Sequence, residues 1–155
     1  MFYFDGVLMK IEITIRKAQP DEISWINTQY DQVGFKRSKY DNEFIAIAEV
    51  NGRRAALGRL QYVVENEAEL GGMYVREEFR GYGLASKIVE FLINNSESYN
   101  KVYCLPFSHL ESFYKKFGFC VVTSKENIPS SVIDKHYWCN STYEGETLLF
   151  VLNKE

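Results

Sequence analysis

The sequence has few cysteines, and their spacing argues against frameworks built on them. Cys104, Cys120 and Cys139 are an odd number at wide spacing, without the CxxC pairs that a zinc site or redox motif requires. Each lies in or beside an apolar segment, so we expect reduced, buried thiols and no metal. This cysteine usage suits a cytoplasmic protein, which is the location we expect.

Runs of one charge sign are also missing. The chain has 18 basic and 21 acidic residues, a formal net charge of -3, and no block of five or six like charges. A nucleic-acid-binding domain usually shows a basic patch or stripe, so we expect no nucleic-acid partner.

No targeting or membrane-spanning signal is visible in the apolar N-terminal segment. Residues 1–8 are too few to span a bilayer, and they lack the basic region and cleavage site of a signal peptide, so we expect no membrane partner. Because Met9-Lys10 leads directly into an alternating strand, we interpret residues 1–8 as an N-terminal extension. Residues 9–155 are then one domain, as the length and the 46% hydrophobic content suggest.

Hydrophobic periodicity predicts a mixed α/β domain around one central sheet. A strand over residues 11–16 precedes a helix that starts near Pro20 and has Ile23, Ile26 and Tyr30 on one face. Residues 31–42 show no period and are interpreted as a loop, with a short second helix as the alternative. The later elements are predicted in this order: strands 43–50, 53–64 and 68–75, helix 83–94, strand 101–105, helix 108–117, strand 119–123, a short helix near 130–137 and strand 147–152.

Turn and cap residues sharpen this assignment. Asn51-Gly52 is the dipeptide best suited to a type I′ hairpin turn. Gly71-Gly72 inside a strand indicates a bulge or a close backbone approach. Ser108, with Glu111 three residues on, predicts a helix N-cap, and Gly118 predicts its C-cap. Regular βαβ alternation is absent, which argues against a doubly wound nucleotide fold.

The turn that precedes the predicted helix 83–94 has the features of an anion site. The first amides of a helix lack internal partners, glycines let the backbone approach phosphate oxygens, and Arg80 adds a cation. A P-loop would need a lysine beside Gly83, and a dinucleotide-binding fingerprint would need a glycine where Ser86 stands. The sequence therefore matches neither of these phosphate-binding motifs. The alternative is that Gly81 and Gly83 only shape a tight turn.

Two motifs together resemble one known family. Val75, followed five residues later by Arg80-Gly81-Tyr82-Gly83-Leu84-Ala85, resembles the acyl-CoA pyrophosphate loop of the GNAT acetyltransferase superfamily. Phe113-Tyr114-Lys115-Lys116-Phe117-Gly118-Phe119 resembles its second signature. The resemblance covers the chain from about Met9 to its end, and it implies a central mixed, largely antiparallel sheet with flanking helices.

The resemblance implies an N-acetyltransferase that uses acetyl-CoA, without a metal, and acetylates a primary amine of a small molecule or peptide in a ternary complex. The acidic balance gives no preference for anionic acceptors, and a monomer or a homodimer is expected. The alternative is a catalytically silent acyl-CoA-binding module with a regulatory or interaction role.

The family pattern also implies which residues bind the co-substrate. Main-chain groups of Met73, Tyr74 and Val75 would pair with the pantetheine arm, and one of these amides could serve as the oxyanion donor. The amides expected to wrap the pyrophosphate belong to Arg80, Gly81, Tyr82, Gly83, Leu84, Ala85 and Ser86. Two residues depart from the family pattern. Glu78 stands where many members have Gln or Arg, and Phe107 stands where many members have an Asn that binds pantetheine.

Tyr114 matches the family's general acid, which protonates the leaving thiolate; the alternative is a core aromatic. Glu69, six residues before Val75, is the candidate base, with a solvated glutamate or a water chain as alternatives. Five aromatics are candidates for an acceptor pocket or for ordinary packing: Trp25, Tyr30, Tyr137, Trp138 and Tyr143.

Overall fold

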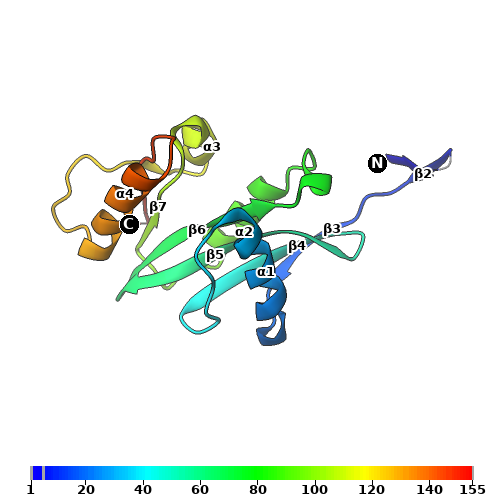
Figure 1. Ribbon diagram of the computed structural model, residues 1–155, viewed down its shortest axis with the longest axis horizontal. Coiled ribbons are helices and arrows are strands. Elements are labelled where there is room, and N and C mark those ends of the chain that lie inside the picture. The colour runs from blue at the N-terminus through cyan, green and yellow to red at the C-terminus, as the bar shows by residue number, and fades with distance from the viewer. Residues whose placement is uncertain (1, 5, 155) are drawn as a thin grey trace.

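A seven-stranded mixed sheet forms the centre of the protein, as the computed structural model of residues 2–4 and 6–154 shows (Figure 1). Its strand order is β3-β4-β5-β6-β7-β9-β8. The strands are β3 Ile13–Lys17, β4 Glu43–Val50, β5 Arg53–Val64, β6 Glu67–Val75, β7 Lys101–Cys104, β8 Cys120–Val121 and β9 Phe150–Asn153. The β6–β7 pair is parallel and the other neighbours are antiparallel, which confirms the predicted fold class.

The predicted N-terminal extension contains a small hairpin of its own. Strands β1 Phe2–Phe4 and β2 Val7–Met9 pair with each other in a separate two-stranded sheet, which Figure 1 shows at the end of an extended segment. Met1 and Asp5 of this extension, and Glu155 at the end of the predicted domain, lie outside the described residues.

Helices cover both faces of the sheet. The helical segments are η1 Pro20–Glu22, α1 Ile23–Val33, η2 Glu77–Phe79, α2 Leu84–Asn94, η3 Ser108–Leu110, α3 Glu111–Lys115 and α4 Ser130–Thr142. Alternation along β4 separates two cores, because Ile45 and Ile47 pack under α1 whereas Ala46 and Ala48 face α2. On β7, Tyr103 packs with α4 while its neighbours join the α2 core, so α4 lies on the α1 face.

The hairpin between β4 and β5 forms as predicted. Asn51 and Gly52 have φ values of 50° and 80°, so both central residues adopt the positive φ that a type I′ turn requires. This turn fixes the register of the adjacent Val50–Arg53 and Glu49–Arg54 pairs. A register shift between Ala48 and Glu49 then places Ile45 opposite Arg59.

Several predictions of caps, helix bounds and cysteine burial are wrong in detail. Ser108 makes no side-chain cap; Phe107 is the N-cap of the 3₁₀ turn, so the predicted capping box does not form. The helix near 130–137 runs on to Thr142. The predicted loop 31–42 starts later than expected, because α1 continues to Val33, and the alternative of a second helix within it is wrong. Cys120 is exposed rather than buried, because β8 is an edge strand, whereas Cys104 and Cys139 are buried as predicted.

The predicted bulge at Gly71-Gly72 is present, and it lies where β6 leaves β7. The ladder between β6 and β7 ends at the Leu70–Cys104 pair, while β6 continues to Val75. Against β5 the register shifts between the Leu57–Tyr74 and Arg59–Gly71 pairs, which inserts one extra residue on β6. The far half of β6 therefore has β5 on one side and a widening gap on the other.

Tyr30 and Arg59 hold the bulge from the α1 face. The buried Tyr30 hydroxyl donates to the Gly72 carbonyl at 2.8 Å, and the Arg59 guanidinium lies 4.4 Å from the Tyr30 ring centre. Gly72 has φ +60°, and a Cβ there would lie 2.5 Å from the Tyr30 hydroxyl oxygen and 2.8 Å from Arg59 Nε. Gly72 is therefore required both by its backbone conformation and by lack of space.

Gly72→Ala should destabilise the protein by about 3 kcal/mol, because backbone strain and overpacking both contribute. Gly34→Ala is the matched control: Gly34 has φ +74° but open space around its Cβ position. Gly34→Ala should lower the free energy of unfolding by only about 1 kcal/mol, because only the backbone strain contributes. Urea denaturation of both variants measures the difference, and equal losses would show that the Tyr30–Arg59 packing does not restrict this position.

Candidate active site

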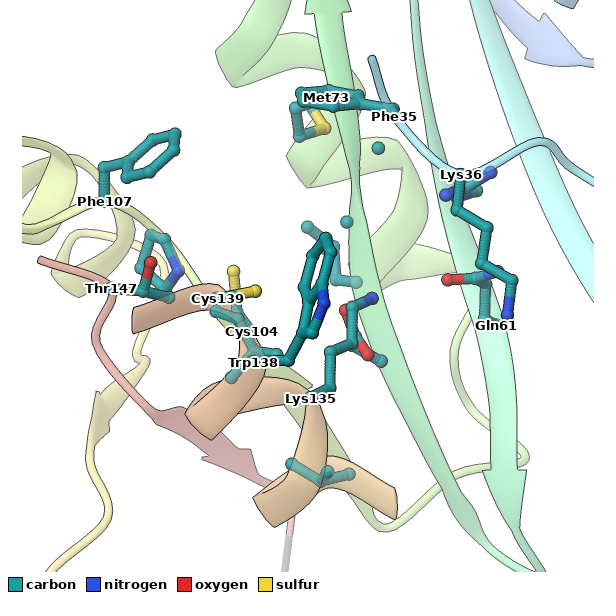
Figure 2. A pocket seen from close by; sticks show the side chains of 18 of the residues that line it. Phe35, Lys36, Gln61, Met73, Cys104, Phe107, Lys135, Trp138, Cys139 and Thr147 are labelled. Carbon is teal, nitrogen blue, oxygen red and sulfur yellow. The ribbon is translucent and has the colours of Figure 1, made fainter. Parts of the chain in front are cut away.

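A cavity of about 860 Å³ opens on the α1 face, between β5, β6 and α4. Its walls come from segments far apart in the sequence: the loop after α1, the bulged half of β6, the end of β7, and α4. Figure 2 shows Lys36 and Gln61 on one wall and Lys135, Trp138 and Cys139 of α4 on another. The cavity thus begins where the bulge separates β6 from β7.

Glu69 lies inside this cavity and forms an ion pair that the sequence did not reveal. Its Oε2 atom lies 2.7 Å from Lys135 Nζ, and the two side chains are 9% and 40% exposed. The expected alternative, a solvated glutamate, is therefore wrong. Sequence reasoning missed Lys135 because it lies on a weakly amphipathic helix 66 residues further along the chain.

Tyr114 also lines the cavity, from α3. It is only 5% exposed and makes edge contacts with Phe113 and Phe119, so it is a core aromatic and a cavity residue at once. Burial, followed by the neighbouring Cys104, raises the pKa of its phenol above the ordinary value. The hydroxyl consequently stays protonated at neutral pH and can donate a hydrogen bond.

Cys104 is a buried thiol at the end of β7 and forms part of the same wall. Burial, with a smaller effect of the Glu69 carboxylate, raises the pKa of the thiol. Since the thiolate is the reactive form, Cys104 is unreactive as a nucleophile in this environment.

A second cavity, of about 220 Å³, lies at the N-terminus of α2. The predicted pyrophosphate-binding residues that line it are Arg80, Gly81, Gly83, Leu84, Ala85 and Ser86, and Val75, predicted to pair with the pantetheine arm, lines it as well. Gly83 is the N-cap with φ 72° and provides no side-chain cap, and Gly81 has φ 92°. The first amides of α2 therefore open into the cavity with the positive end of the helix dipole behind them.

The two cavities lie along the same stretch of β6. On β6, Met73 lines the large cavity and Val75 lines the small one. On α3, Tyr114 lines the large cavity and its neighbour Phe113 lines the small one. Of the other predicted binding residues, Tyr74 packs partly buried against the α1 core and the Tyr82 side chain is exposed, so only their main chains are candidates for contact.

Residues that depart from the family pattern, and the candidate aromatics, have separate surroundings. Glu78 pairs with Arg76 at 3.5 Å, which partly offsets its charge near the small cavity. Phe107 lines the large cavity and packs edge-on against Tyr143. Of the five aromatics proposed for an acceptor pocket, Trp138 and Tyr143 line the large cavity. The other three do not: Tyr30 is a core residue, Trp25 is partly buried and stacks with Arg54, and Tyr137 is exposed.

Comparison with known families decides the identity of this arrangement. The sequence profile described as the acetyltransferase (GNAT) domain matches residues 41–121, which include β6, the glycine turn, α2 and Tyr114. The chain belongs to the GNAT acetyltransferase family. No curated protein sequence matches it significantly.

Solved structures share the GNAT fold at low sequence identity. Rv2747 from Mycobacterium tuberculosis, solved with CoA, gives a TM-score of 0.71 at 16% identity, over 90% of this chain and 98% of that one. The ribosomal-protein-S18-alanine N-acetyltransferase of Escherichia coli gives 0.68 at 18% identity, over 93% and 95%. N-acetylglutamate synthase from Neisseria gonorrhoeae, solved with coenzyme A and N-acetyl-glutamate, gives 0.69 at 16% identity over 93% of this chain, which spans only 35% of that synthase chain.

The described residues show neither a metal-binding group nor a membrane-spanning helix. Within residues 2–4 and 6–154, no three His, Cys, Asp or Glu side chains are grouped so as to hold a metal ion. No helix in this part of the GNAT domain is long and apolar enough to cross a membrane.

The Glu69–Lys135 pair should be energetically coupled. In a double-mutant cycle of Glu69→Gln and Lys135→Met, we expect a coupling of about 1 kcal/mol or more, because Glu69 is largely shielded from water. The same changes at Glu111 and Lys115, an exposed pair at 2.6 Å, are the matched control and should give less than about 0.5 kcal/mol. Urea denaturation of the wild type and the six variants measures both, and equal couplings would contradict a special role for burial.

Proposed function

We propose that this GNAT chain transfers an acetyl group from acetyl-CoA to a primary amine of a small molecule or peptide, by direct attack in a ternary complex. The observation that carries the proposal is that two cavities lie along one stretch of β6: uncapped helix amides open into one, while a carboxylate and a protonated phenol line the other. Membership of the family and the CoA complexes of two structural neighbours support it.

In this proposal the small cavity holds the pyrophosphate. A Cβ at Gly81 or Gly83 would meet no protein atom within 4 Å, so phosphate oxygens have room to approach the backbone amides. Arg80 is exposed at the same turn, and its Nε lies 3.4 Å from the Val75 carbonyl oxygen. The guanidinium is thus close enough to contribute a positive charge to the site.

The pantetheine arm would then follow β6 toward the large cavity. Because β7 pairs with β6 only as far as Leu70, the edge from Gly71 to Val75 offers main-chain groups to a ligand. Met73, Tyr74 and Val75 would bind the arm in the manner of an added strand. This path brings the thioester to the space between Glu69 and Tyr114.

Three groups of the chain would carry the chemistry. Glu69 accepts a proton from the acceptor ammonium, so that the nitrogen lone pair can attack the thioester carbon. A β6 amide donates to the carbonyl oxygen while the C–N bond forms and negative charge develops. Tyr114 donates a hydrogen bond to sulfur as the C–S bond breaks, and the second proton that the nitrogen loses on becoming an amide neutralises the departing thiolate. Because its pKa is raised, stabilisation by this hydrogen bond becomes more important than complete proton transfer.

Gly83→Asp should weaken acetyl-CoA binding by roughly tenfold or more, because it places a carboxylate at the mouth of α2, where the pyrophosphate would bind. Gly52→Asp is the matched control, since Gly52 also has positive φ and open space but lies in the β4–β5 turn. Isothermal titration calorimetry measures the affinities of both variants. Wild-type-like affinity of Gly83→Asp would contradict the assignment of this turn.

Tyr114→Phe should lower kcat about a hundredfold, with the acetyl-CoA affinity almost unchanged, because the lost hydroxyl acts only on the departing sulfur. Thiol release with a panel of amines measures turnover, and calorimetry measures binding. Lower affinity with unchanged turnover would contradict the role of Tyr114. A wild-type protein that binds acetyl-CoA but acetylates no amine would instead be the silent binding module.

A further inference from the structure

The Glu69–Lys135 ion pair occupies the part of the large cavity where the proposed reaction needs an amine. Lys135 Nζ is itself a primary ammonium, 2.7 Å from the carboxylate that would receive the acceptor's proton. An acceptor ammonium must therefore share Glu69 with Lys135 or displace it. What becomes of Lys135 then depends on the other groups that the acceptor carries.

Positive charge exceeds negative charge on the cavity wall. Among the described residues that line the cavity, Lys36, Arg59 and Lys135 are cationic and Glu69 is the one carboxylate. The charge of Arg59 is compensated by residues outside the cavity lining. Its Nη1 donates to Ser38 Oγ at 2.6 Å and lies 3.8 Å from Glu43 Oε1. Lys36 is exposed beside Gln61, so a positive group stands at the mouth as well (Figure 2).

Displacement of Lys135 has different consequences for different acceptors. A simple amine that takes over Glu69 leaves the Lys135 ammonium without its carboxylate, in a partly shielded position, which opposes binding. An acceptor that carries a carboxylate beside its amine replaces both halves of the pair: its ammonium binds Glu69 and its carboxylate binds Lys135. Both charges remain paired throughout.

We propose that the acceptor is a free amino acid with an apolar side chain, whose ammonium binds Glu69 and whose carboxylate binds Lys135. The inference rests on the proposed acetyl transfer and narrows its acceptor. Phe107, Trp138 and Tyr143 form an aromatic wall that suits an apolar side chain. The overall acidity of the chain suggested no preference for anionic acceptors, but the local charges of the cavity favour an acceptor that carries a carboxylate beside its ammonium.

Acceptors that differ only in the carboxylate test the proposal. The first set is L-phenylalanine, L-phenylalaninamide and phenethylamine; the second is L-leucine, L-leucinamide and 3-methylbutylamine. With wild-type protein, kcat/KM from thiol release should be about tenfold or more higher for each free acid than for its amide and its simple amine. Amidation lowers the pKa of the amine and by itself favours the amide, so the expected preference opposes the intrinsic reactivity.

Lys135 variants identify the residue responsible. Lys135→Met should raise KM for the free acids about tenfold, because their carboxylate loses its partner. It should leave kcat/KM of the amides unchanged or higher, because the variant removes the ammonium that competes with the acceptor for Glu69. Lys135→Arg keeps the charge and should retain the preference for free acids. Lys125→Met is the matched control, because Lys125 is exposed and does not line either cavity; it should behave as wild type.

Thermal stabilisation of the CoA-bound protein by each acceptor provides a readout that does not require turnover. Stabilisation by the free acids alone, lost in Lys135→Met, supports the acceptor class even if no thiol is released, in which case the proposed catalysis fails. Acetylation of all members of each set at similar kcat/KM overturns the acceptor class and leaves the proposed function intact. A protein that neither binds nor acetylates any of the six compounds overturns this inference.

Discussion

The candidate site depends on the bulge in β6 at Gly72. The bulge is fixed from one face of the sheet by the buried Tyr30 hydroxyl, which donates to the Gly72 carbonyl, and by the Arg59 side chain packed against both residues. β6 pairs with β7 only over its first four residues, and the bulge begins where this ladder ends. The gap beside the far half of β6 opens into the large cavity, which Gly71, Gly72 and Met73 line.

Two different electrostatic environments adjoin this gap. At α2 the positive charge comes from main-chain amides and a helix dipole, which suits the diffuse negative charge of a pyrophosphate. At α4 the charges are localised: the Glu69 carboxylate suits one ammonium, and the Lys135 ammonium beside it suits one carboxylate. The geometry thus separates an expected co-substrate end from an expected acceptor end along one strand.

Burial gives the polar groups of the large cavity their chemical character. The Tyr114 phenol and the Cys104 thiol remain protonated because neither charged form is well solvated there. Glu69 is also shielded from water, but the ammonium beside it compensates its charge. A carboxylate and a neutral donor that line one cavity are the two kinds of group that general base and acid roles require.

Local signals in the sequence determined the β4–β5 hairpin, the bulge, the glycine turn and the order of the main elements. Each rests on neighbouring residues, such as Asn51-Gly52 or Gly71-Gly72, whose backbone preferences act without distant partners. Tertiary structure alone decided the Glu69–Lys135 pair, the charge on the cavity wall and the exposure of Cys120. These depend on contacts between residues far apart in the chain, which no local pattern encodes: sheet order placed α4 over β7, and this placement brought Lys135 to Glu69.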